Sequence, residues 1–313
     1  MTYVLLIVGF IALIVGADWL VDGATSVGIR AKLSPLIIGL TIVAFGTSLP
    51  ELIINVFSCA KGSSGLAIGN IVGSNIMNIL FILGIASMIY PIDVSRVSLR
   101  RDVPAGFIAT GILLLLANFF QGDVKVINWA EGIVLLICVG IYIWSMTYIK
   151  DSNDSEVETV QIPMPWGKTI LYLLGGIGFL YLGGELVSQN AQKIALAWGM
   201  SESLVGLTIV AVATSLPELI TSVVAATKKN AGIAIGNVLG SNIMNIVVVL
   251  GVSALITPLE FDSKMNFNLV ILLAAHSLML LFVFTGKGRK LSRFEGLIMT
   301  LAYLSFMTYT ILG

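Results

Sequence analysis

Residues 41–53 read TIVAFGTSLPELI, and residues 208–220 read TIVAVATSLPELI. Each stretch is mainly apolar, and each carries the sequence TSLPE in its second half. Burying an ionised carboxylate among apolar groups is costly unless something pairs with it. The same costly arrangement occurs in two places, which indicates that the two copies serve one purpose.

The composition of the whole chain is typical of a membrane protein. Of its 313 residues, 57% are hydrophobic and 11% are charged, and the mean hydropathy is +1.01. A helix that crosses the hydrocarbon core needs roughly 20 apolar residues, and segments of this kind follow one another along the chain. The composition therefore predicts an all-α polytopic membrane protein that is surrounded by lipid and has no nucleic-acid partner.

Polar residues, glycines and prolines divide the chain into ten predicted transmembrane helices. These helices are expected at residues 3–29, 35–60, 66–91, 103–120, 128–149, 167–195, 203–226, 232–256, 265–285 and 293–312. The one strongly polar connection, 150–165, lies near the middle of the chain. It predicts a five-helix unit at 1–149, a cytoplasmic linker at 150–165 and a second five-helix unit at 166–313.

A second motif is also present twice, at the same separation. GNIVGSNIMNI at 69–79 matches GNVLGSNIMNI at 236–246, and both pairs of stretches are 167 residues apart, since 208 − 41 = 167 and 236 − 69 = 167. The two halves are therefore expected to be copies of one unit. Because each unit has an odd number of helices, the second must enter the membrane from the opposite side. The repeats are predicted to be inverted.

The distribution of positive charge predicts the orientation of the chain, because lysine and arginine concentrate in cytoplasmic loops. With the N-terminus outside, thirteen of the 17 basic residues fall in inner loops and four in outer loops. The inner ones are Arg30, Lys32, Arg96, Arg100, Arg101, Lys150, Lys168, Lys228, Lys229, Lys287, Arg289, Lys290 and Arg293, and the outer ones are Lys61, Lys125, Lys193 and Lys264. We therefore expect both termini to lie outside.

The repeated motifs place acidic groups inside the predicted spans. Glu51 and Glu218 are expected well inside the membrane, with no lysine or arginine at the same depth, so a bound cation is their natural partner. Pro50 and Pro217 have no N–H, so the carbonyl groups about four residues earlier lose their usual donors. Such carbonyls are tolerated at membrane depth only in cavities lined by protein or water.

Hydroxyl and amide side chains extend this set of oxygen atoms. Helical spacings of three and four residues place them on common helix faces. The candidate ligands are Thr47, Ser48, Glu51, Ser74 and Asn78 in the first half and Thr214, Ser215, Glu218, Ser241 and Asn245 in the second. Hard cations such as Ca²⁺ take about six to eight oxygen ligands at about 2.3 to 2.6 Å. The lack of sulfur and imidazole argues against a site for a soft transition metal.

The GTSLPE and GSNIMN motifs, repeated in inverted halves, resemble the alpha-repeats of the sodium/calcium exchanger family within the cation/calcium antiporter superfamily. The resemblance covers essentially all ten helices, and its diagnostic residues lie in 41–79 and 208–246. It implies that sodium and calcium compete, from alternate sides of a prokaryotic cell membrane, for oxygen ligands between helices two, three, seven and eight.

The resemblance also implies roles for single residues. Glu51 and Glu218 would be carboxylate ligands shared between ion sites, and Ala44 and Ala211 would offer carbonyl oxygens. The sequence departs from the family at one place, because many members carry an aspartate where Asn245 stands. With two carboxylates, the site is neutralised by one divalent ion, which weakens the case for potassium co-transport.

The predicted function is a secondary antiporter in which sodium entry drives calcium out by alternating access, with helices one and six as the moving element. A proton/calcium antiporter of the same fold is an alternative. A cation channel, or an intramembrane protease with paired carboxylates, accounts less well for the duplicated hydroxyl and amide ligands. The chain is not expected to be an enzyme, to hold a cofactor besides transported Ca²⁺ and Na⁺, or to need an obligate protein partner.

Four features outside the motifs receive structural interpretations. Asp18 and Glu185 are equivalent by the 167-residue offset and are expected to be structural or to line an access path. His276, the only histidine, is expected to be packed and hydrogen-bonded. The acidic stretch 151–158 lacks the glycine and spacing of a calcium-binding loop and is expected to be a solvated linker.

Overall fold

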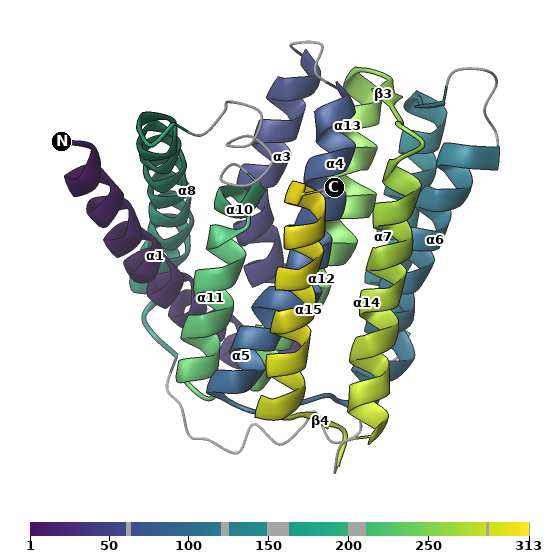
Figure 1. The fold of residues 1–313 in the computed structure, drawn as a ribbon. Helices are drawn as coiled ribbons and strands as arrows, with labels where there is room; N and C mark the ends of the chain where they lie inside the picture. Colours follow the sequence, from purple (N-terminus) through teal and green to yellow (C-terminus); the bar gives the residue numbers. More distant parts are fainter. Residues whose placement is uncertain (61–63, 120–124, 149–162, 200–210, 286–287, 313) are drawn as a thin grey trace.

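The computed structural model describes residues 1–60, 64–119, 125–148, 163–199, 211–285 and 288–312 (Figure 1). Its helices are α1 (Thr2–Ala31), α2 (Pro35–Ile38), η1 (Gly39–Val43), α3 (Ala44–Ala60), α4 (Ser64–Met77), η2 (Asn78–Ile82), α5 (Leu83–Ile89), η3 (Ser98–Asp102), α6 (Val103–Phe119), α7 (Trp129–Tyr148), α8 (Trp166–Ala197), α10 (Ala211–Thr214), α11 (Leu216–Thr227), α12 (Ala231–Met244), η5 (Asn245–Leu250), α13 (Gly251–Ile256), α14 (Met265–Thr285) and α15 (Arg293–Leu312). The segments labelled η are π-helical turns.

Each of the ten predicted helices has a counterpart among these elements, and the protein is a helical, multi-pass membrane protein. Eight of the described helices are long and apolar enough to cross a membrane. The fourth predicted helix corresponds to α6, and the seventh is described only from Ala211 onward, as α10 and α11. Residues 203–210 of that prediction and most of the predicted linker at 150–165 lie outside the described residues.

The two halves repeat one pattern of helix and π-helical turn. In the first half α4 is followed by η2 and α5, and in the second half α12 is followed by η5 and α13. Asn78 and Asn245, which are 167 residues apart, each begin the π-helical turn. Single π-helical turns inside α-helices are frequent at functional sites, and the periodicity of the sequence alone did not predict these.

Helices α1 and α8 form a close pair at one side of the molecule (Figure 1). Glycines allow the two backbones to approach: a Cβ on Gly16 would lie 2.7 Å from the Leu180 nitrogen, and a Cβ on Gly176 would lie 2.7 Å from the Leu20 nitrogen. Small residues at helix contacts are typical of packing in membranes, where close van der Waals contact drives association. The backbones of α1 and α8 are therefore closely packed along their contact.

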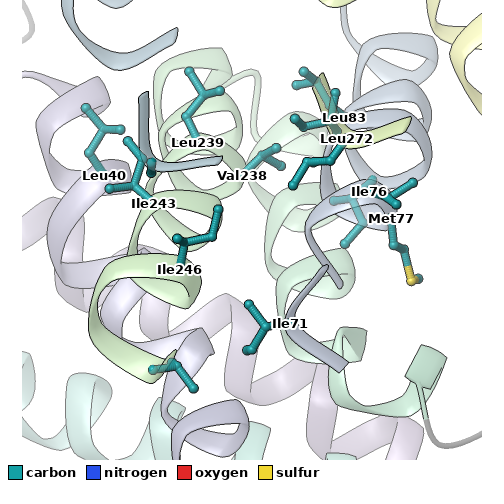
Figure 2. Packing of buried hydrophobic residues seen from close by; sticks show 14 of the residues in the cluster. Leu40, Ile71, Ile76, Met77, Leu83, Val238, Leu239, Ile243, Ile246 and Leu272 are labelled. Atoms are coloured by element: carbon teal, nitrogen blue, oxygen red, sulfur yellow. The ribbon is translucent and has the colours of Figure 1, made fainter. Parts of the chain in front are cut away.

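Helices α4 and α12 lie in the centre of the molecule and carry much of its apolar core. Figure 2 shows part of this core, including Ile71 and Ile76 of α4 and Val238 and Ile243 of α12. Large apolar side chains also cover the outside, as on α7, where Trp144 is 61% exposed. Charged and polar side chains are meanwhile buried inside. Apolar side chains on the exterior, with the polar and charged groups of the spans turned inward, are expected for a protein in lipid.

Within the described ranges, four two-residue strands join the halves: β1 (Ile92–Asp93), β2 (Val126–Ile127), β3 (Leu259–Glu260) and β4 (Lys290–Leu291). Antiparallel pairing links β1 with β4 and β2 with β3, so each pair takes one strand from each half. The two chain ends lie toward the same end of the molecule (Figure 1), as the even number of predicted helices requires.

Candidate cation site

Glu51 of α3 and Glu218 of α11 are completely buried. Their side chains lie close enough to interact with each other. In the described part of the chain, the ion pairs involve neither glutamate. Among the described residues, two acids thus meet in the interior without an ion-paired basic side chain, which is the arrangement that the repeated motif predicted.

The helix around each glutamate differs between the two halves. Pro50 lies inside a continuous α3, whereas Ser215 interrupts the second copy between α10 and α11, with φ −90° and ψ 4°. Pro217 therefore stands in the first turn of α11, where its missing N–H leaves no intrahelical bond unmade. The prediction of one continuous helix at 203–226 was therefore wrong at Ser215, whereas the loss of a donor to the carbonyl groups before each proline stays a prediction.

Two serine hydroxyl groups lie next to one carboxylate oxygen of Glu218. The Ser48 hydroxyl donates to Glu218 Oε1 at 3.1 Å, and the Ser241 hydroxyl lies 3.5 Å from the same oxygen. Thr47 Oγ1 lies 3.4 Å from Ser241 Oγ and donates to Asn237 Oδ1 at 3.0 Å. Residues from both halves of the chain therefore meet at one carboxylate.

The equivalent groups in the other half are arranged differently. Ser215 and Ser74 correspond to Ser48 and Ser241, yet their buried hydroxyls contact no hydrogen-bond partner. Both carboxylate oxygens of Glu51 also lack a donor. Thr214 donates to Asn70 Oδ1 at 3.3 Å. The halves of the site are thus equivalent in sequence and unequal in conformation.

Seven buried oxygen atoms of the predicted ligands have no hydrogen-bond partner in the structure. They are Glu51 Oε1 and Oε2, Glu218 Oε2, Ser74 Oγ, Ser215 Oγ, Asn78 Oδ1 and Asn245 Oδ1. Unsatisfied buried acceptors are costly, and a hard cation such as Ca²⁺ takes carboxylate, hydroxyl and amide oxygens together as ligands. Within the described residues no three His, Cys, Asp or Glu side chains gather as a metal cluster. Of the seven oxygen atoms, three belong to carboxylates and four to neutral hydroxyl and amide groups.

The two alanines are placed at the starts of helical segments. Ala44 begins α3, and its carbonyl accepts the Thr47 hydroxyl at 3.2 Å. Ala211 begins α10, four residues before the break at Ser215. Their carbonyl oxygens as ion ligands stay predictions.

Sequence reasoning missed several polar residues in this region. Asn70 and Asn237 accept from the threonines of the opposite half, and Asn75 and Asn242 bond to each other's backbone. All four belong to the repeated sequence GNxxGSN, so its duplication is the signal that could have identified them.

The residues that the sequence analysis singled out outside the motifs make other contacts. Asp18 forms an ion pair with Lys228, and the side chain of Glu185 is exposed. His276 is buried, as expected, with Nδ1 bonded to the carbonyl of Leu272 at 2.9 Å.

One basic side chain is more buried than the sequence suggested. Arg101 is 4% exposed and pairs with Asp102 at 2.7 Å, and Tyr142 donates to the same carboxylate at 3.1 Å. The pair lies in η3, just before the fourth predicted helix. Because Asp102 balances the charge of Arg101, the pair offers no net charge to the two glutamates.

A family model described as sodium/calcium exchanger protein matches residues 1–148 and 168–312. The chain belongs to the sodium/calcium exchanger protein family. Among relatives of this family, the putative antiporter CaxA of Alkalimonas amylolytica is 34% identical over 97% of this chain and 96% of its own length. The sodium/calcium exchanger MaX1 of Methanosarcina acetivorans is 28% identical, with 97% of both chains covered.

Two further exchanger-like proteins bear on the coupling ion. The Ca²⁺/H⁺ antiporter ChaA of Bacillus subtilis is 25% identical over 86% of this chain and 82% of its own length. A solved structure of the sodium-calcium exchanger NCX_Mj, soaked with 2.5 mM Na⁺ and 0.1 mM Ca²⁺, has a TM-score of 0.81 and 30% identity, with 98% of this chain and 97% of that chain covered. The relatives are transporters, and the fold of this chain is that of an exchanger.

Proposed function

We propose that this protein is an antiporter that exchanges sodium for calcium across the membrane at a site built around Glu51 and Glu218. The observation that carries the proposal is the pair of buried, mutually interacting carboxylates with no basic partner among the described ion pairs. Ca²⁺ neutralises both carboxylates at once, whereas Na⁺ does so only when two ions bind. Competition between the two ions follows from this charge requirement.

The chemistry of the donors supports calcium as the divalent ion. The proposed ligands are all oxygen atoms, from two carboxylates and from neutral hydroxyl and amide groups. Four of the neutral oxygens have no hydrogen-bond partner, and they belong to Ser74, Ser215, Asn78 and Asn245. Calcium accepts about six to eight such oxygens in irregular geometry, whereas magnesium demands a near-ideal octahedron. The ligands would come from four helical segments on both halves of the chain, so binding would link those halves.

Alternating access is supported by the unequal conformation of the two halves. The second copy is interrupted at Ser215 and the first is continuous through Pro50. Repeats that exchange conformations produce states open to opposite sides of the membrane. We infer that the closely packed α1–α8 pair moves as a unit across the site.

A cation channel is a weaker candidate, because the two glutamates are fully buried and a conducting pore would wet them. A proton/calcium antiporter is a closer alternative. It is favoured by the similarity to ChaA, and two adjacent carboxylates could exchange protons for calcium.

The test is calcium-45 uptake into proteoliposomes that are loaded with sodium and diluted into sodium-free medium, with an imposed pH gradient as the comparison. We expect uptake to follow the sodium gradient and to be lost in Glu51→Gln and in Glu218→Gln. Glu185→Gln is the matched control, since that carboxylate is exposed on α8. Uptake that follows only the pH gradient would assign the protein to proton coupling, and uptake retained in both glutamine variants would remove the site assignment.

A further inference from the structure

Four asparagines from the two halves form one buried network. Asn75 lies near the C-terminus of α4, and Asn78 is the first residue of η2. Asn242 and Asn245 occupy the equivalent places in α12 and η5. The exposed fraction of each is 2% or less. Four hydrogen bonds connect them, and each bond crosses from one half of the chain to the other.

The orientation of the first two amides is fixed by the backbone. Asn75 Nδ2 donates to the Asn242 carbonyl at 2.9 Å, and Asn242 Nδ2 donates to the Asn75 carbonyl at 3.1 Å. A carbonyl oxygen only accepts hydrogen bonds, so an amide that faces it must present its NH₂ group. The Oδ1 atoms of Asn75 and Asn242 are thereby turned the other way.

These two Oδ1 atoms in turn orient the next pair of amides. Asn78 Nδ2 donates to Asn242 Oδ1 at 2.9 Å, and Asn245 Nδ2 donates to Asn75 Oδ1 at 3.2 Å. With their NH₂ groups held in this way, Asn78 and Asn245 can offer only oxygen to the remaining space. Those two oxygens are among the buried atoms that contact no hydrogen-bond partner.

We propose that Asn75 and Asn242 are positioning residues that hold the amide oxygens of Asn245 and Asn78 toward the transported cation, each from the opposite repeat. The proposal rests on the cation site proposed above and adds two residues to it. Without the anchor, an amide can rotate and present NH₂, which repels a cation. The anchors thus keep both amides in the form that binds.

The crossed pattern separates this role from a general effect on folding. Asn242 acts on Asn78, which lies in the other half, although Asn245 lies only three residues away on the same stretch of helix. Substitutions that merely disturb the helix around residue 242 would affect Asn245 first. Coupling between Asn242 and Asn78, and between Asn75 and Asn245, is therefore the distinctive prediction.

The test is calcium-45/calcium exchange in proteoliposomes with calcium on both sides, which requires no assumption about the coupling ion. We expect Asn242→Ala and Asn75→Ala to raise the half-saturating calcium concentration by about tenfold each, the order expected for losing the one buried hydrogen bond that orients each ligand amide. The maximal rate should stay within about twofold, because a ligand is loosened and the moving helices are unchanged. Asn190→Ala on α8 is the matched control, since that buried amide bonds to the Leu186 carbonyl of its own helix.

Double variants decide the pattern. If Asn242 acts through Asn78, Asn78→Ala combined with Asn242→Ala will shift half-saturation no further than Asn78→Ala alone, whereas Asn242→Ala combined with Asn245→Ala will multiply the two single effects. Multiplication in the crossed pairs would overturn the proposal, as would single variants that behave like Asn190→Ala. Should Asn242→Ala fail to yield folded protein by size-exclusion chromatography, Asn75→Ala with Asn245→Ala makes the same test. Absence of calcium exchange in the unsubstituted protein would instead contradict the proposed function.

Discussion

Lys228 ties α1 to the turn after α11, and this contact offers a quantitative test of alternating access. Its Nζ lies 2.7 Å from Asp18 Oδ1 and 2.6 Å from Asp22 Oδ1. The distribution of positive charge predicts that this turn lies on the cytoplasmic face. A state that opens on this face by moving α1 away from the turn must break both ion pairs, so we predict that Lys228→Met favours that state.

The magnitude follows from the exposure of the three side chains. Lys228 is 31% exposed, and Asp18 and Asp22 are 49% and 43% exposed, so solvent screens both pairs. An exposed pair contributes about 0.2 to 1 kcal/mol, and we take about 1 kcal/mol for the two together. That free energy corresponds to about a fivefold change in the equilibrium between the two states.

The assay is the half-saturating calcium concentration at each face of vesicles of known sidedness. When a binding-competent state is minor, apparent affinity rises in proportion to its population, so half-saturation at the cytoplasmic face should fall by up to about fivefold in Lys228→Met. The opposite face should change little, and high salt should reduce the difference. Lys229→Met is the control, since it removes the same charge from the neighbouring exposed position. Equal shifts in the two variants, or equal shifts at the two faces, would refute the reasoning.

Two other substitutions test the packing of the fold. Gly16→Leu should disrupt the α1–α8 pair and reduce transport, because even a Cβ at this position would lie 2.7 Å from the Leu180 nitrogen. Gly178→Ala should be tolerated, because nothing lies within 4 Å of its Cβ position. Transport rates and yields of folded protein compare the two variants, and a functional Gly16→Leu would contradict the close packing. Arg101→Leu should lower the free energy of unfolding by about 3 to 5 kcal/mol, since it leaves the buried carboxyl of Asp102 without its ion-pair partner. Arg100→Leu, at an exposed position, should have little effect. Thermal unfolding in detergent measures both variants, and equal melting temperatures would argue against a structural ion pair.

The duplicated motifs made much of the fold and the site predictable. Glu51 and Glu218 could be paired because each stands at the same point of a repeated unit, and helical spacing predicted Ser48 on the face of Glu51 and Ser241 on the face of Asn245. In the structure the two glutamates lie close enough to interact, and the hydroxyls of Ser48 and Ser241 both lie at Glu218 Oε1.

The remaining features depend on packing between the halves, which spacing along one helix does not reveal. Asn75 and Asn242 become important because their side chains reach the backbone of the other half. The break at Ser215 has no counterpart at the equivalent Ser48, so two nearly identical sequences adopt different conformations. Arg101 is buried because Asp102 follows it directly and pairs with it.

The most direct test of the central claim is competition between sodium and calcium for binding to the purified protein. Calcium-45 binding is measured at equilibrium while sodium is titrated, in the unsubstituted protein and in the double variant Glu51→Gln/Glu218→Gln. The account predicts that sodium lowers the apparent calcium affinity without changing the number of sites, and that the double variant binds no calcium. Calcium binding that ignores sodium, or that persists when both carboxylates are neutralised, would contradict it.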